Sequence, residues 1–253
     1  MVEALVPGYA RRYAEEYDGW FAKPADPAVH RLAGLAGAGP VLELGIGTGR
    51  VAVPLHELGV PVHGVDCAEE MVARLRHKPG GRDIPVTIGD FADVPVPGPF
   101  SLIYVASGTF FELPSQRAQL RCLRNAARRL QPGGLVVIDA FLPEALFQLA
   151  ARGESTVPAA NGDLVMCTRT LAPDQQRYSS HYAVTTGEGV HELDVSFRYA
   201  GMGELDLMAR LAGLTLRNRW GDWSGGPLDG SSVYHVSCYE IDNADDAEDL
   251  DRG

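Results

Sequence analysis

The most constraining feature of this chain is a glycine turn that follows an apolar strand and precedes an acid. Residues 41–49 read Val-Leu-Glu-Leu-Gly-Ile-Gly-Thr-Gly, and a second apolar run, 60–65, ends at Asp66. Glycine has no Cβ, so a ligand can approach the backbone of such a turn closely. An acid about 20 residues further on, at the end of the next strand, is placed to accept hydrogen bonds from two ribose hydroxyls. The pattern predicts a pocket for an adenosine-bearing ligand at the carboxyl edge of a parallel sheet.

The glycine spacing departs from the dinucleotide-binding pattern. That pattern, Gly-x-Gly-x-x-Gly, places a pyrophosphate on a helix N-terminus. Gly45 and Gly47 fit it, but Arg50 occupies the closing position and the third glycine, Gly49, comes one residue early. Glu43, within the strand, would be costly to bury unless a cationic or amide group met it. A nicotinamide-dependent oxidoreductase is an alternative, and both Arg50 and Glu43 argue against it.

Five segments in order resemble the motifs of one enzyme family. Residues 43–49, Glu-Leu-Gly-Ile-Gly-Thr-Gly, resemble the first motif of class I S-adenosylmethionine-dependent methyltransferases. The second to fifth motifs have counterparts in the same order at 65–71, 88–91, 100–105 and 130–139. The resemblance implies a doubly wound, seven-stranded, mostly parallel α/β sheet and S-adenosyl-L-methionine as cofactor. The last third of the chain is similar in layout, less specifically, to bacterial methyltransferases of small molecules.

The resemblance also implies a set of cofactor-binding residues drawn from these motifs, the end of the fourth strand and an N-terminal aromatic segment. They are Tyr13, Tyr17, Glu43, Gly45, Gly47, Gly49, Asp66, Cys67, Met71, Asp90, Phe91, Ala106 and Ser107. Asp66 would bind the ribose hydroxyls, and Asp90 would accept from the adenine amine. The N-terminal Tyr-x-x-x-Tyr-Asp segment would fold over the cofactor, where aromatic faces attract a sulfonium. Core packing is the alternative for Met71 and for the aromatic segment.

Strand-like and helix-like segments alternate along the first 150 residues. Strands are expected at 41–45, 60–65, 85–89, 100–105 and 134–140, and helices at 28–35, 48–58, 69–77 and 115–130. Alternation at this pitch predicts a parallel, doubly wound sheet with ligands at its carboxyl edge. The β-rich runs 163–171, 177–186 and 190–199 predict an antiparallel β insertion after strand five. Helix 203–212 and strands 214–220 and 232–240 then resume the sheet.

This layout predicts five segments with different roles. They are an N-terminal helical cap (1–36), a cofactor-binding core (37–150), an antiparallel insertion that covers the substrate or forms a dimer (151–201), the completion of the sheet (202–241) and an acidic disordered tail (242–253). Within the cap, the spacing of Tyr9, Tyr13, Tyr17 and Trp20 puts their side chains on one helical stripe.

Composition narrows the classes of partner. The net charge of −11 disfavours a nucleic-acid substrate, because phosphate binding requires a basic face. Six acids and one arginine lie within 242–253, as expected of a solvated tail. The four cysteines are scattered, so we expect reduced thiols and no zinc site. With no membrane-length apolar run and no secretory signal, the sequence predicts a cytoplasmic protein.

Substrate contacts are expected from the carboxyl edge and its cover. Strand four leads into an apolar segment expected to be flexible, and the sixth strand leads into two tryptophans beside glycines, which suit a flat or apolar substrate. The candidate substrate-binding residues are Phe110, Phe111, Phe141, Tyr182, Trp220 and Trp223. Core or lid packing is the alternative for each tryptophan. The row of arginines at 117, 121, 124 and 128 is interpreted as a solvated helix face.

The sequence does not single out a catalytic base. The candidates are His181, His191 and His235, since imidazole titrates near neutrality, and Tyr17. The alternative for each histidine is a surface residue or a core residue with its hydrogen bonds satisfied. A bound metal is not expected, because Ala106 and Ser107 replace the first acid of metal-dependent catechol-type methyltransferases, and Ala140 follows Asp139 where they have an Asp-Asn pair.

The function predicted is transfer of a methyl group from S-adenosylmethionine to oxygen or nitrogen of a small molecule, with secondary metabolism as its setting. An activated methyl group needs alignment of a nucleophile within about 3–3.5 Å and exclusion of water more than acid–base help. An amine acceptor that bound neutral would need no strong base. A second hypothesis is a methyltransferase fold repurposed for cyclisation or rearrangement, since fold does not fix function. A homodimer through the insertion is a further expectation.

Overall fold

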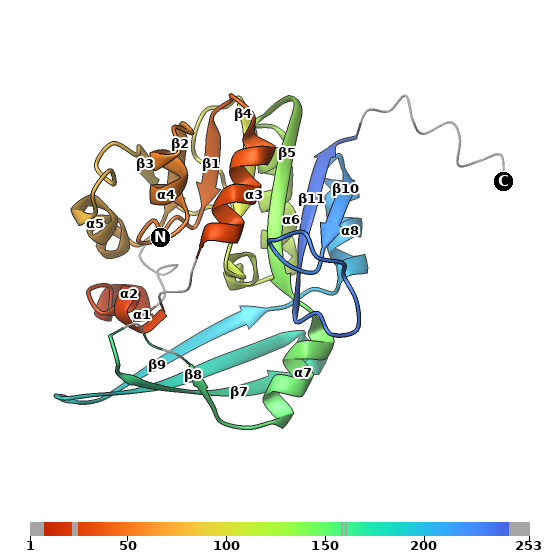
Figure 1. Cartoon of the computed structure of the whole chain (residues 1–253). Coiled ribbons are helices and arrows are strands. Elements are labelled where there is room, and N and C mark those ends of the chain that lie inside the picture. The colour runs from red at the N-terminus through yellow and green to blue at the C-terminus, as the bar shows by residue number, and fades with distance from the viewer. Residues whose placement is uncertain (1–7, 22–24, 158, 160, 243–253) are drawn as a thin grey trace.

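A seven-stranded sheet forms the centre of the computed structural model, which describes residues 8–21, 25–157, 159 and 161–242 (Figure 1). Its strands run in the order β10-β11-β5-β4-β1-β2-β3. Their bounds are β1 Val41–Leu44, β2 Val62–Asp66, β3 Val86–Ile88, β4 Phe100–Val105, β5 Leu130–Phe141, β10 Leu214–Trp220 and β11 Tyr234–Ile241. β11 is antiparallel to both β5 and β10, and the other pairs are parallel. The fold class expected from the sequence is confirmed.

Two apolar layers, one on each face, cover this sheet and bury its central strands. β1 and β4 contain no exposed residue, as expected of parallel strands between helices. Residues of α6 (Gln116–Ala127) and α8 (Met202–Leu211) pack on one face with Leu42, Leu44 and Ile103. Residues of α3 (Asp26–Ala36), α4 (Ala52–Glu57) and α5 (Glu69–His77) pack on the other with Val41, Leu102 and Tyr104. The period of two along each strand thus divides the core into two halves.

A second sheet holds the residues of the expected insertion and lies across the carboxyl end of the core sheet (Figure 1). It is antiparallel, in the order β6-β7-β8-β9, and comprises β6 Ser155–Val157, β7 Leu164–Ala172, β8 Arg177–Thr186 and β9 Gly189–Arg198. The sequence predicted β7, β8 and β9 but missed β6 and the preceding helix α7 (Pro143–Ala151). The short 3-10 turn η3 (Pro173–Gln175) joins β7 to β8.

Buried polar contacts fasten this second sheet to the core. Arg198, at the end of β9, is only 6% exposed, and its guanidinium donates to the side chains of Gln119, Gln176 and Glu204. Gln119, on α6, donates back to the carbonyl oxygen of Arg198 over 2.9 Å. Since buried charges need such partners, this network fixes how the insertion meets α6 and α8.

The N-terminal segment differs from the expected single stripe. It forms two short helices, α1 (Gly8–Arg12) and α2 (Tyr17–Phe21), with turn residues between them. The break turns Tyr13 away from Tyr17, so that the Tyr13 ring packs on Trp20 and His191 with centroid distances of 5.4 and 5.6 Å. The side chain of Tyr9 and residues 243–253 of the expected acidic tail lie outside what the structure describes.

The segment after β4 also differs from expectation, because it is ordered rather than a flexible loop. Thr109–Glu112 form a 3-10 helix, η2, whose Phe110 and Phe111 are fully buried in the core. None of the helices in the described part of the chain has the length and apolar character that a bilayer crossing requires.

Candidate active site

The glycine turn after β1 adopts a backbone that only glycine tolerates easily. Gly45, Gly47 and Gly49 have φ values of 77°, 54° and 76°. A Cβ at Gly49 would lie 2.7 Å from the side chain of Leu75, and one at Gly45 would lie 2.6 Å from Thr109. A Cβ at Gly47 would meet nothing within 4 Å. The turn therefore combines two close-packed positions with one that opens onto free space.

Asp66, at the end of β2, is oriented by two backbone amides. The N–H of Gly47 donates to its Oδ2 over 2.7 Å, and the N–H of Ala68 donates to its Oδ1 over 2.8 Å. Burial raises the pKa of this carboxyl, which is 9% exposed, and the amide hydrogen bonds oppose that rise. Each oxygen keeps a lone pair for a further donor, so the carboxylate can hold the two hydroxyls of a ribose.

These elements border a small cavity, which we call the nucleoside cavity. Its volume is about 80 Å³. Its lining combines the glycine turn, the ends of β2 and α5, the N-terminal helices and η2: Ala10, Tyr17, Gly45, Gly47, Asp66, Cys67, Ala68, Met71, Phe91, Thr109 and Glu112. Six of the expected cofactor residues beyond the N-terminal segment meet here, together with Tyr17.

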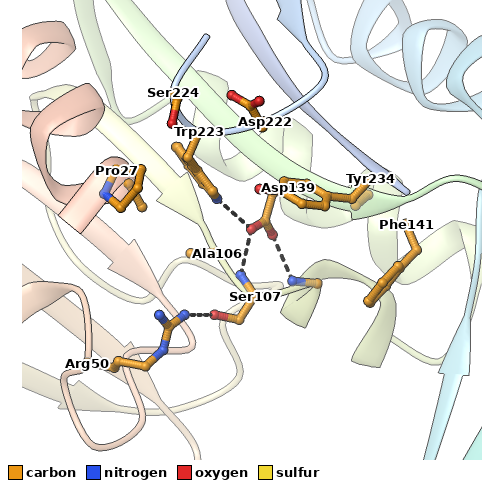
Figure 2. Close-up of a pocket in the computed structure, with 13 residues that line it drawn as sticks. Pro27, Arg50, Ala106, Ser107, Asp139, Phe141, Asp222, Trp223, Ser224 and Tyr234 are labelled. Carbon is orange, nitrogen blue, oxygen red and sulfur yellow. Dashed lines mark hydrogen bonds between the residues drawn. The ribbon is translucent and has the colours of Figure 1, made fainter. Parts of the chain in front are cut away.

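A buried carboxylate shapes the turn that follows β4. Asp139, on β5, accepts hydrogen bonds from the N–H groups of Ser107 and Gly108 over 3.0 and 2.7 Å and from the Trp223 indole over 2.9 Å (Figure 2). Ser107 and Gly108 have φ values of 66° and 73°, a conformation that costs about 1–2 kcal/mol for a residue other than glycine. Burial raises the pKa of Asp139, while its three donors favour the ionised form.

A larger cavity of about 330 Å³, the edge cavity, lies beside this turn (Figure 2). It is lined by Pro27, Ala28, Arg50, Ala106, Ser107, Gly108, Asp139, Ala140, Phe141, Asp222, Trp223, Ser224 and Tyr234. Arg50 donates to the hydroxyl of Ser107. Arg50, which follows the glycine turn directly, also lines the insertion cavity described below.

The third cavity, of about 160 Å³, lies between the core edge and the second sheet, and we call it the insertion cavity. Its lining is Tyr17, Phe21, Arg50, Ser107, Gly108, Thr109, Glu112, Phe141, Arg169, Tyr178, Tyr182, Leu193, Val195 and Phe197. It shares Tyr17, Thr109 and Glu112 with the nucleoside cavity. Ligands bound in these two cavities would therefore share part of their wall.

Comparisons with known proteins agree with this geometry. The family model described as a methyltransferase domain matches residues 41–134. A cypemycin N-terminal methyltransferase from a Streptomyces species is 33% identical over 192 residues, which span 74% of this chain and 77% of that protein. The CcbJ methyltransferase of Streptomyces caelestis has 38% sequence identity and a TM-score of 0.84, covering 93% of this chain and 98% of its own. This chain belongs to the class I S-adenosylmethionine-dependent methyltransferases. The resemblance drawn from its sequence is confirmed.

The same fold recurs at lower identity. CalS10, an amino pentose methyltransferase from Micromonospora echinaspora with bound S-adenosylmethionine, is 20% identical with a TM-score of 0.62, covering 85% of this chain and 89% of its own. The residues around the nucleoside cavity fit this cofactor, because Asp66 has unused acceptor sites and Gly47 leaves open space. Within the described residues, no cluster of three or more metal-ligating side chains is present.

Several expected cofactor residues of this methyltransferase lie outside the nucleoside cavity. Glu43 is buried behind the turn, where it accepts from the Tyr104 hydroxyl over 2.7 Å, and burial raises its pKa to about 8. Asp90 forms an ion pair with Arg121 over 2.6 Å and accepts a hydrogen bond from the N–H of Ala92. Gly49 packs on the α5 side chain of Leu75. Ala106 and Ser107 line the edge cavity, and Tyr13 packs against the insertion.

None of the three candidate histidines lines the nucleoside, edge or insertion cavity. His181 lies on the outer face of β8, 3.0 Å from Asp194, and the ring of His191 packs on Tyr13 and Trp20. His235 is buried on β11, and burial lowers its pKa to about 4. Tyr17 does line two cavities, but burial, then the charge of Glu112, raises its pKa and makes it a poor base.

The expected substrate residues divide in the same way. Phe141 and Tyr182 line the insertion cavity, and Trp223 lines the edge cavity, where it holds Asp139. Trp220 instead stacks under Arg31, whose guanidinium carbon lies 4.7 Å from its ring centroid. Phe110 and Phe111 are core residues, as described above.

Three charged residues that line these cavities were not assigned to the site from the sequence: Arg50, Glu112 and Arg169. Arg50 was considered only as a departure from the dinucleotide pattern. Arg169 had a usable signal, since it is a charge at a position where the period of two in a β-strand expects an inward-facing apolar residue. Glu112 had none, because its place depends on the buried turn after β4.

A hydrogen bond joins the N-terminal segment to the glycine turn. The hydroxyl of Thr48, which is 2% exposed, donates to Asp18 Oδ1 over 2.6 Å. Lys78, just after α5, approaches the other oxygen of Asp18 at 2.7 Å. These contacts hold α2, and with it Tyr17, over the nucleoside cavity.

Replacing Asp66 tests the ribose site. We expect Asp66→Asn to weaken binding of S-adenosylmethionine and of S-adenosylhomocysteine about 100-fold, because charge-assisted hydrogen bonds contribute about 1.5–3 kcal/mol each. Isothermal titration of both compounds measures this, with Asp93→Asn, on the exposed side of the same region, as the matched control. Unchanged affinity in the variant would reject the assignment.

Replacing Thr48 tests the contact with α2. Thr48→Val keeps the side-chain shape but removes the donor to Asp18, so we expect about 10-fold faster dissociation of S-adenosylhomocysteine, measured by stopped-flow fluorescence. Lys78→Met removes the more exposed ion pair and should change the rate about twofold or less. Equal rates for Thr48→Val and the unaltered protein would show that α2 does not retain the cofactor.

Proposed function

We propose that this methyltransferase methylates an amine nitrogen of a small molecule in secondary metabolism, and that the acceptor binds in the insertion cavity. The observation that carries the proposal is the shared wall of Tyr17, Thr109 and Glu112 between the nucleoside and insertion cavities. An acceptor in the insertion cavity would face the cofactor across this wall, while the second sheet covers it from water.

The titratable groups of the insertion cavity favour nitrogen over oxygen. A neutral amine attacks with its own lone pair, whereas a hydroxyl needs a base. Among the described lining residues there is no imidazole, and burial raises the pKa of Tyr17, Tyr178 and Tyr182. Glu112 supplies a carboxylate that can accept a hydrogen bond from an ammonium or amine. The lining thus suits an acceptor that needs orientation rather than deprotonation by a strong base.

The name of one relative also supports nitrogen as the methyl-accepting atom. The protein that is 33% identical is named as an N-terminal methyltransferase of cypemycin, so its acceptor is an amino group. The other similar structures with N-methyltransferases in their names are 20% identical or less and carry only the fold.

Each residue then has a defined task in the proposed reaction. S-adenosylmethionine supplies a methyl group already activated by the positive charge on sulfur. Asp66 holds the ribose, and Tyr17 presents an aromatic face to that charge, an attraction of about 0.5–2 kcal/mol. Arg50, beside the glycine turn, is placed to bind the carboxylate of the cofactor's methionine moiety. Glu112 orients the acceptor nitrogen and takes a hydrogen bond from it as charge develops.

Product analysis tests this function. Labelled S-adenosylmethionine is incubated with a metabolite extract of the host, and the methylated product is identified by mass spectrometry and nuclear magnetic resonance. We expect label on an amine nitrogen, and a rate that rises with pH until the amine is deprotonated. Glu112→Gln should lower kcat/KM about 10–100-fold, and Glu144→Gln, on the exposed side of α7, should not. Label on a hydroxyl oxygen, or cofactor binding with no transfer to any compound, would refute the proposal.

We also propose that the enzyme acts in the cytoplasm as a homodimer formed through the insertion. The four cysteines are free, as in a reducing compartment. Leu164 and Val190 flank Thr185 on the outer face of the second sheet and are 50% and 63% exposed, which offers an apolar contact. Sedimentation of the full chain should give a dimer that Val190→Asp dissociates, and a monomer at all concentrations would reject this interface.

A further inference from the structure

The second sheet presents one face to the insertion cavity and the other to solvent. Three pairing rungs point inward: Leu171–Tyr178–Phe197, Arg169–Ser180–Val195 and Cys167–Tyr182–Leu193. The rungs between them, such as Thr168–His181–Asp194 and Thr170–Ser179–Ser196, point outward and are polar. This alternation is what a half-buried antiparallel sheet requires. Arg169, in the middle inward rung, is the exception.

The surroundings of Arg169 are mostly apolar. Above and below it lie rungs with aromatic rings, of which Tyr178 and Phe197 stack with centroids 4.6 Å apart. Its neighbour Ser180 is 1% exposed. Among the described residues, no carboxylate pairs with Arg169 and its guanidinium makes no hydrogen bond, although it lines a cavity and is only half-exposed. A charge in such a place is costly without an anionic partner.

Glu112, the carboxylate among the described lining residues, does not supply that anionic partner. Glu112 and Arg50 belong to the core side, where Arg50 donates to Ser107 and Glu112 faces the nucleoside cavity as well. The positive charge of Arg169 opposes the rise that burial causes in the pKa of Tyr178 and Tyr182, so this charge lies near both phenols. The cavity thus has an acid at its cofactor end and a guanidinium on its opposite wall.

We propose that Arg169 binds a carboxylate of the methyl acceptor, so that the substrate is an amino acid or a larger molecule with both an amine and a carboxylate. The inference rests on the proposed function, since it places the amine at Glu112. A guanidinium matches a carboxylate with two parallel hydrogen bonds, and the aromatic lining strengthens the pair by excluding water. Binding at both ends would point the nitrogen, rather than the carboxylate, toward the cofactor.

The experiment compares the acid and the methyl ester of the acceptor that labelled S-adenosylmethionine reveals in the host extract. Wild-type enzyme should have at least about a 10-fold lower KM for the acid than for the ester, with similar kcat. Arg169→Met should raise KM for the acid to the value for the ester and leave kcat within about threefold. Arg169→Lys, which keeps the charge without the planar fork, should give an intermediate KM. Arg217→Met, a half-exposed arginine on β10, is the control.

The outcomes separate this inference from the function on which it rests. The unfolding temperature of Arg169→Met and its affinity for S-adenosylhomocysteine should match those of the unaltered protein, since a general loss of structure would lower both. Absence of any methylated amine would refute the proposed function and the inference together. A methylated amine with no carboxylate, or a preference for acid over ester that persists in Arg169→Met, would overturn the inference alone.

Discussion

The buried carboxylate of Asp139 is the interaction on which the whole site depends. It holds the N–H groups of Ser107 and Gly108 in a left-handed turn and takes a third hydrogen bond from Trp223. Three donors offset the burial of the charge, because a buried anion is stable only when its lone pairs are satisfied. The turn starts η2, and η2 places Thr109 and Glu112 on the wall that the nucleoside and insertion cavities share. One residue on β5 thus holds a turn that, with the residues following it, contributes to all three cavities.

The cofactor side of the site was predictable because it is encoded by local pattern. Glycine spacing, an acid at the end of the next strand and alternating apolar runs predicted a common site for Gly45, Gly47, Asp66, Cys67, Met71 and Phe91, and these six residues line one cavity. Helix α5 was also predicted with its exact bounds, since charged and apolar residues alternate there with helical period. Glu43 and Gly49 belong to the same motif but serve its packing: one is buried with Tyr104 and the other against Leu75.

The insertion cavity was less predictable because its residues come from five separate regions of the chain. The inward face of β7, β8 and β9 follows from pairing register, which a sequence indicates only weakly. The candidate histidines illustrate the difference: His181 and Tyr182 are neighbours in sequence, yet one faces Asp194 in solvent and the other faces the cavity. A break of a few residues between α1 and α2 likewise separates Tyr13 from Tyr17.

The nucleoside cavity is small for the cofactor that we expect it to bind. Cofactor pockets usually have volumes of about 300–1,000 Å³, whereas this cavity measures about 80 Å³. Its lining comes from the glycine turn, the end of β2, the residues that follow β2 and β3, α5, η2 and the two N-terminal helices, of which α2 is held by the contacts of Asp18. Tyr17, on α2, also lines the insertion cavity, so one residue contributes both to the expected cofactor site and to the proposed acceptor site. A shared wall that became ordered on binding would couple the two ligands thermodynamically, since each would pay less ordering entropy when the other is bound.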